Sequence, residues 1–156
     1  MDTKLLYYKI YEGDVEPWDY IEWAMNMLEN ECSSASLNIL SALEEPLNIF
    51  EVEDYFNRVS SEIVLRKPTY EECAQYFINH LFKTILQDEN NAVEIAYEIY
   101  KVSSEHINTE ELSKWYGISE MIDDFRYGDN VESLTKSTLT SVIVQEAKKQ
   151  LQESGK

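Results

Sequence analysis

The sequence predicts an all-α fold, and three observations support this prediction. Apolar residues recur three and four positions apart along nearly the whole chain, as on one face of a helix. Glycine and proline, with four and three residues among 156, are too scarce for the many tight turns of all-β folds. Apolar residues make up 44% of the chain, enough for a packed core. We expect one domain, residues 1–156, as a multi-helix bundle or a short irregular α-solenoid of about eight helices.

The first third of the chain contains one segment whose secondary structure the sequence does not decide and two segments with a helical pattern. Residues 4–11 fit either a helix or a strand. Pro17 suits the first turn of a helix over 17–28, since its missing N–H costs nothing there. A short apolar pattern follows, and we expect Ser33 or Ser34 to cap it.

Two strong helix starts lie in the middle of the chain. Asn48 can cap a helix that has Glu51 at its third position and an apolar stripe to residue 63. Thr69 and Glu72 have the spacing of a capping box, and the clearest stripe of the chain follows them. We expect this second helix to be central, with Phe77 and Leu81 in the core.

The last third of the chain is also expected to be helical. Predicted starts are Asn90 or Asn91, Thr109, Ser119 and Asp129, the last with Glu132 at the third following position. Gly117 and Gly128 are expected to end the two helices that precede them. The final helix should reach about residue 152, and the tail, residues 153–156, should fray.

The formal charge of −17 is the strongest functional signal, with 30 acidic against 13 basic side chains. Residues 1–78 hold 16 acids and five bases, and residues 79–156 hold 14 and eight. Contacts with phosphates need clusters of Lys and Arg, so the charge argues against binding nucleic acid or an anionic membrane surface. A basic protein partner would explain it, and so would general solubility or drift.

The cellular location is expected to be the cytoplasm. The two cysteines, Cys32 and Cys73, do not make a disulfide framework. No apolar run is long enough to span a bilayer, and residues 1–11 make a poor signal peptide because Lys9 interrupts them.

No motif of catalysis, metal binding or nucleotide binding is present. The four glycines cannot form a phosphate loop. His80 and His106 do not have the spacing to other ligand residues that metal-binding motifs require. The segment 123–134 has a glycine at the sixth position of a calcium loop, but three ligand positions hold Phe125, Tyr127 and Leu134. We therefore predict no catalytic residue, no metal and no cofactor, and a protein that is not an enzyme.

Candidate partner-binding residues combine aromatic rings with nearby carboxylates. Trp and Tyr supply much of the binding energy at interfaces, and surrounding acids would meet Lys and Arg of a partner. Acids in a first helical turn also interact favourably with the helix dipole, which leaves solvation and capping as the alternative explanation. The candidates are Trp18, Tyr20, Trp23, Glu51, Glu53 and Asp54.

Part of the chain resembles a known type of protein. Pro17-Trp-Asp-Tyr-Ile-Glu-Trp23, Ser36-Leu-Asn-Ile-Leu40 and Asn48-Ile-Phe-Glu-Val-Glu-Asp-Tyr-Phe56 are similar to segments of small all-helical bacterial proteins of the toxin-immunity type. The resemblance covers about residues 17–56. It implies a stoichiometric binder that blocks the active site of a toxin or a neighbouring exosite, and it assigns no residue a role.

These observations favour a non-enzymatic, acidic protein-binding module, an immunity or antitoxin-like inhibitor of a basic bacterial toxin. One alternative is a helical adaptor or scaffold protein, which could act as a homodimer. A minor alternative is a carboxylate-dependent hydrolase. The sequence leaves the oligomeric state open.

Overall fold

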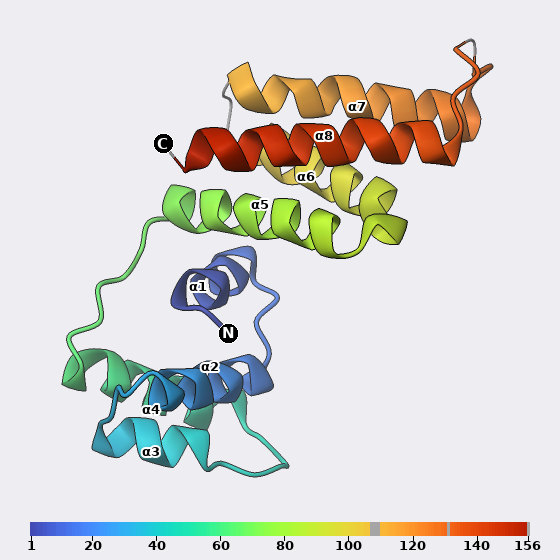
Figure 1. The fold of residues 1–156 in the computed structure, drawn as a ribbon. Coiled ribbons are helices and arrows are strands. Elements are labelled where there is room, and N and C mark those ends of the chain that lie inside the picture. Colours follow the sequence, from blue (N-terminus) through green and yellow to red (C-terminus); the bar gives the residue numbers. More distant parts are fainter. Residues whose placement is uncertain (107–109, 131, 156) are drawn as a thin grey trace. The chain divides into compact units, whose positions relative to one another are not determined.

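The computed structural model describes residues 1–106, 110–130 and 132–155 and has only helices as regular structure in these ranges, which confirms the predicted all-α fold (Figure 1). It contains eight α-helices and one short 3-10 helix, η1, within this part of the chain. Their bounds are α1 (Thr3–Glu12), α2 (Pro17–Glu29), α3 (Ala35–Ser41), α4 (Ile49–Glu62), α5 (Tyr70–Gln87), η1 (Glu89–Asn91), α6 (Ala92–His106), α7 (Glu110–Tyr127) and α8 (Lys136–Ser154).

The chain divides into two compact units, Met1–Cys73 and Ala74–Lys156. The boundary falls in the first turns of α5. The prediction of a single domain stays a prediction.

Residues 4–11, which the sequence left open between helix and strand, form α1. The Asp2 carboxylate accepts a hydrogen bond from the Lys4 N–H (2.8 Å) at its start. Gly13 ends the helix with φ of 77°, a left-handed conformation that favours glycine, and its N–H bonds back to the last turn.

Three predicted helix starts of the first unit are confirmed, two of them with their capping residues. Pro17 is the first residue of α2. Ser34, not Ser33, caps α3 by accepting a hydrogen bond from the Leu37 N–H (3.1 Å). Asn48 caps α4 by accepting one from the Phe50 N–H (2.9 Å). Local side-chain chemistry therefore sets where these helices begin.

An aromatic cluster forms the centre of the first unit. The Phe56 ring of α4 lies 5.1 Å from the rings of both Tyr20 and Trp23 in α2, measured between centroids. The Tyr7 ring of α1 meets Phe56 edge-on at 5.8 Å. Phe56 thus joins three helices, and the buried aliphatic residues Ile21, Leu37, Leu40, Val52 and Val59 complete this core.

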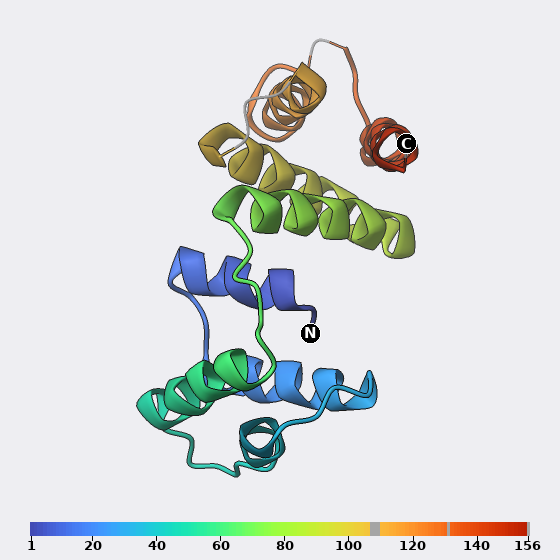
Figure 2. The same ribbon diagram turned by 90° about the vertical axis from the view of Figure 1, so that its left-hand side faces the viewer.

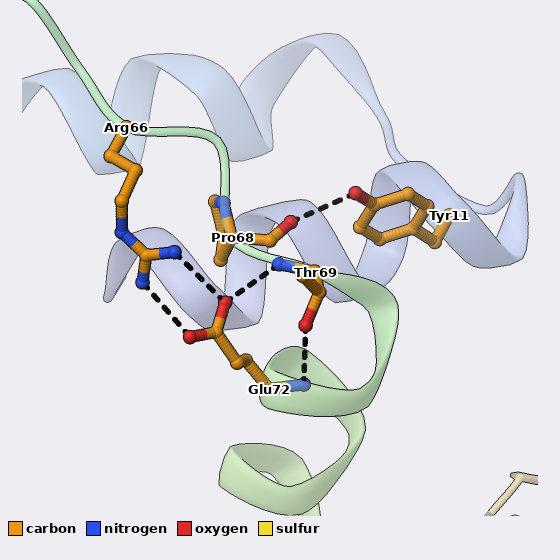
Figure 3. A network of polar contacts seen from close by, with 5 residues as sticks. All are labelled: Tyr11, Arg66, Pro68, Thr69 and Glu72. Carbon is orange, nitrogen blue, oxygen red and sulfur yellow. Dashed lines mark hydrogen bonds and ion pairs between the residues drawn. The ribbon is translucent and has the colours of Figure 1, made fainter.

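A polar network fixes the segment that leads into α5 (Figure 3). The Arg66 guanidinium donates to both oxygens of the Glu72 carboxylate, at 3.2 and 3.0 Å. The predicted capping box is present, because the Thr69 N–H donates to Glu72 (2.7 Å) and the Glu72 N–H donates to the Thr69 hydroxyl (3.2 Å). The Tyr11 hydroxyl of α1 donates to the Pro68 carbonyl (2.8 Å). Side chains thus hold this connection to α1 and to the first turn of α5.

The second unit is held by contacts among its helices. The rings of Phe82 in α5 and Trp115 in α7 stack with centroids 5.5 Å apart and planes 21° apart. Both side chains are buried. At the surface, Arg126 of α7 pairs with Glu94 of α6 at 2.8 Å, and Lys114 of α7 approaches Glu146 of α8 at 3.9 Å.

Two helix boundaries of the second unit differ from prediction. Gly117 does not end a helix and Ser119 does not start one, because α7 runs through both. The cost of a mid-helix glycine, about 1 kcal/mol, is outweighed by burial of Trp115 and Ile118 on either side of it. The Ser119 hydroxyl donates back to the Tyr116 carbonyl at 2.6 Å instead of capping.

The start of α8 was also predicted wrongly, at Asp129. The helix begins at Lys136, and Thr135 caps it by accepting a hydrogen bond from the Thr138 N–H (3.1 Å). The physical reason lies in Asn130, whose side chain bonds both backbone groups of Leu134, at 2.8 and 3.0 Å, and so holds a turn. At its far end α8 includes positions 153 and 154 of the tail that was expected to fray. The predicted start at Thr109 lies outside the described residues.

The most deeply buried residues of α5 are not the two that the sequence predicted. Leu81 is buried as predicted, whereas Phe77 is only half-buried. Phe82, with Ile78 and Ile85, is the more completely buried part of this helix.

Replacing Phe82 by Ala should therefore lower the free energy of unfolding by about 3–5 kcal/mol, because it removes a buried ring and leaves a cavity against Trp115. Urea unfolding measures this loss. Tyr127→Ala is the matched control, since that ring is highly exposed and its removal should change the free energy by less than about 0.5 kcal/mol. A loss below about 1 kcal/mol for Phe82→Ala would contradict the described packing.

The Glu72 network predicts a pH dependence of stability. Hydrogen bonding to Arg66, then to the Thr69 N–H, lowers the pKa of Glu72 from 4.5 to about 2. The stability from this carboxylate is complete above pH 4.5 and is lost as the pH falls toward about 2. Glu72→Gln should thus be less stable than the parent protein above pH 4.5, and the difference should shrink toward pH 2.

Chemical unfolding at a series of pH values and low salt tests this dependence. Glu71→Gln is the control, because Glu71 is the exposed neighbouring acid and makes no ion pair in the described part of the chain. A stability difference for Glu72→Gln that is the same at every pH would show that its ionised form does not stabilise the fold.

Candidate partner-binding surface

Helices α2 and α4 run side by side and start at the same end of the first unit (Figures 1 and 2). The side-chain contacts define their register. Tyr20 of α2 contacts Glu53 of α4. One turn further along both helices, Trp23 contacts Phe56. Residues that precede these contacts on each helix, Trp18 and Glu51, therefore lie at the shared starting end.

Trp18 is an exposed aromatic residue of this end. It follows Pro17 in the first turn of α2 and keeps 49% of its surface accessible. The acids Glu16 and Glu22, just before and one turn after it, are also exposed. A large indole that stays accessible among carboxylates is suited to contact a partner.

Tyr20 and Trp23 are placed in the core, which corrects their expected role as partner contacts. Both are buried against Phe56, and the Trp23 indole N–H donates to the Thr3 hydroxyl (3.0 Å). Burial, with the charge of Glu53 and a hydrogen bond to it, raises the pKa of Tyr20 to about 12. The physical reason is that α2 packs on three helices at once, so its wide apolar face is covered.

The three predicted acids of α4 differ in their surroundings. Glu51 is exposed in the first turn. Glu53 is half-buried and bonds Tyr20. Asp54 is exposed and pairs with Arg58, one turn later, at 2.7 Å. The structure brings all three to the end that carries Trp18, with Glu51 the most available.

Phe50 is a surface residue that the sequence reasoning missed. Its side chain is 78% exposed in the first turn of α4, next to Glu51. The sequence feature that indicates its exposure is its position outside the apolar stripe of Ile49, Val52 and Phe56. Trp18 and Phe50 thus place two exposed aromatic side chains at the starting end of α2 and α4. We call this end, with residues Glu16, Trp18, Glu22, Phe50, Glu51, Glu53 and Asp54, the acidic aromatic surface.

The first unit has a strongly negative field around this surface. Residues 1–73 carry 16 acids and only five bases. Lys9, Arg58 and Arg66 each pair with an acid of the same unit. Lys67 lies over the Tyr11 ring, 5.4 Å from its centroid. The bases are engaged internally, so most carboxylates of this unit remain uncompensated.

The second unit has a hollow on its surface. It has a volume of about 550 Å³ and follows one face of α8 beside η1, between Lys136 and Lys148. Hydroxyl, amide and ammonium groups line it, with Glu89 as the acid. Its lining residues are nearly all exposed, and Val144 is the buried one among them.

Comparisons with known proteins found no family model, no curated protein and no solved structure that matches this chain. Within the described residues, no group of three His, Cys, Asp or Glu side chains is arranged to hold a metal ion. None of the described helices has the length and apolar character needed to cross a membrane.

The placement of the two tryptophans of α2 predicts a large loss of stability when Trp23 is removed and a small change when Trp18 is removed. Trp23→Ala should lower the free energy of unfolding by about 3–5 kcal/mol, because it empties a buried site next to Phe56. Trp18→Ala and Phe50→Ala should each change it by less than about 0.5 kcal/mol, because these side chains are exposed. Thermal and urea unfolding of the three variants measure the effects. Equal losses at Trp18 and Trp23 would contradict the described orientation of α2.

Proposed function

We propose that the protein is a non-enzymatic, acidic binding module that acts as an immunity or antitoxin-like inhibitor of a basic bacterial toxin. The observation that carries the proposal is the acidic aromatic surface, where Trp18 and Phe50 stay exposed among carboxylates. The resemblance of residues 17–56 to immunity-type proteins supports the same function. This segment includes α2, α3 and the first half of α4, and so most of that surface.

The chemistry of the surface divides its residues into two roles. Exposed rings such as Trp18 and Phe50 lose apolar surface to water when a partner covers them, so they govern how slowly the complex dissociates. Acids such as Glu51 attract a basic partner over several ångströms and so govern how fast it associates. Inhibition follows when the bound module covers the active site or exosite of the toxin.

The first experiment identifies the partner and tests the charge. The tagged protein captures its partner from the native host, and stopped-flow mixing then measures association of the purified pair across a salt series. The triple variant Glu51→Gln, Glu53→Gln, Asp54→Asn should associate roughly threefold to tenfold more slowly at low salt, and its rate should depend less on salt.

The matched control removes the same number of charges elsewhere in the first unit. Glu29 and Glu31 lie at the opposite end of α2, and Glu71 lies in the first turn of α5. Their triple Gln variant should associate nearly as fast as the parent protein. Association that is independent of salt and equal in both triple variants would mean that the acids of α4 serve only solubility and capping.

The aromatic residues have a separate kinetic signature. Trp18→Ala and Phe50→Ala should raise the dissociation rate of the complex, by about thirtyfold or more for a residue central to the contact, with little change in association. Dissociation rates unchanged in both variants would place the partner on another surface.

A further inference from the structure

Three tyrosine rings form a continuous ladder across α6 and α7. The centroids of Tyr97 and Tyr100 in α6 are 6.0 Å apart, and those of Tyr100 and Tyr116 in α7 are 5.8 Å apart. Tyr97 and Tyr116 are 40% and 54% exposed, and Tyr100 is half-buried between them. We call these three residues the tyrosine ladder.

Carboxylates lie beside the tyrosine ladder. Tyr116 donates a hydrogen bond to Glu120, one turn later on α7. Helices α6 and α7 are antiparallel, since Tyr100 meets Tyr116 and Glu94 meets Arg126. This register brings the turn of α7 that holds Glu120 and Asp123 alongside Tyr97.

The charges at the ladder are mostly unpaired. Glu120 and Asp123 are exposed and make no ion pair in the described part of the chain. Lys101, one turn after Tyr97, is an exposed base of this face, and Arg126, one turn after Asp123, is paired with Glu94. The face therefore combines aromatic rings with an excess of negative charge.

Two tyrosines of the first unit, the exposed Tyr11 and the half-buried Tyr55, differ from these rings in one respect. The Arg58 guanidinium lies 5.1 Å from the Tyr55 ring centroid, and the Lys67 ammonium lies 5.4 Å from that of Tyr11. Both rings thus bind a cation of the same chain. Within the described residues, the rings of the tyrosine ladder have no such cation over their faces, although the rings and adjacent carboxylates form the environment that attracts one.

We infer that the tyrosine ladder binds an arginine side chain from a basic peptide segment. A planar guanidinium can stack on the exposed rings while it donates hydrogen bonds to Glu120 or Asp123, which a lysine ammonium does less well. The inference goes beyond the proposed function, because the ladder belongs to the second unit and its test needs no natural partner.

The test is an NMR titration of the intact protein with a synthetic arginine–glycine repeat peptide at physiological salt. Signals of Tyr97 and Tyr116 should shift, and affinity should exceed that for the matching lysine–glycine peptide. A peptide with citrulline in place of arginine has the same shape without charge and should not bind. Tyr97→Leu and Tyr116→Leu should each weaken binding about twofold to fivefold, and Tyr→Phe at either position should largely restore it.

Tyr127→Leu is the matched control, because that tyrosine is 83% exposed and lies outside the ladder. Its affinity for the arginine peptide should equal that of the parent protein. The inference is overturned if the arginine peptide does not bind, if the citrulline peptide binds equally well, or if the three Leu variants bind alike. Such results would leave the proposal for the acidic aromatic surface untouched, since that surface is tested with a different ligand and different variants.

Discussion

The packing of Phe56 against Tyr7, Tyr20 and Trp23 is the contact on which the first unit depends. Each of these rings comes from α1 or α2, whereas Phe56 comes from α4, so one side chain joins three helices. Aromatic pairs at these centroid distances stabilise a core beyond the area that they bury. They also have a preferred geometry, and so the contact sets the register between α2 and α4.

This register explains why the acidic aromatic surface exists. Once Tyr20 and Trp23 turn toward Phe56, Trp18 is left on the outside of α2. In the same way, burial of Val52 and Phe56 turns Phe50 outward on α4. Because the two helices start at one end, the exposed rings and the first-turn acids are collected there, and bases such as Lys9 and Arg58 are already paired. Core packing thus leaves Trp18, Phe50 and Glu51 exposed at one end of the first unit.

The sequence predicted features that local chemistry decides. The caps at Ser34, Asn48 and Thr69 need only neighbouring backbone groups, so their residue types reveal them. Features that depend on contacts between distant residues could not be predicted from the neighbouring sequence. Gly117 carries a stop signal, but buried neighbours override it, and nothing within α2 shows which of its aromatic residues the other helices cover. Phe50 could not be told from a core residue by its type, because an aromatic side chain next to an apolar stripe is usually buried with it.

The central claim is that the partner meets the protein at the starting ends of α2 and α4. Cross-saturation NMR on the complex of the labelled protein with its captured partner tests this claim most directly, because it reports which amides lie at the interface. The claim predicts the strongest signal loss at residues 16–22 and 49–54. Loss confined to other parts of the chain, such as the opposite end of α2 around Glu29, with residues 16–22 and 49–54 unaffected, would contradict it.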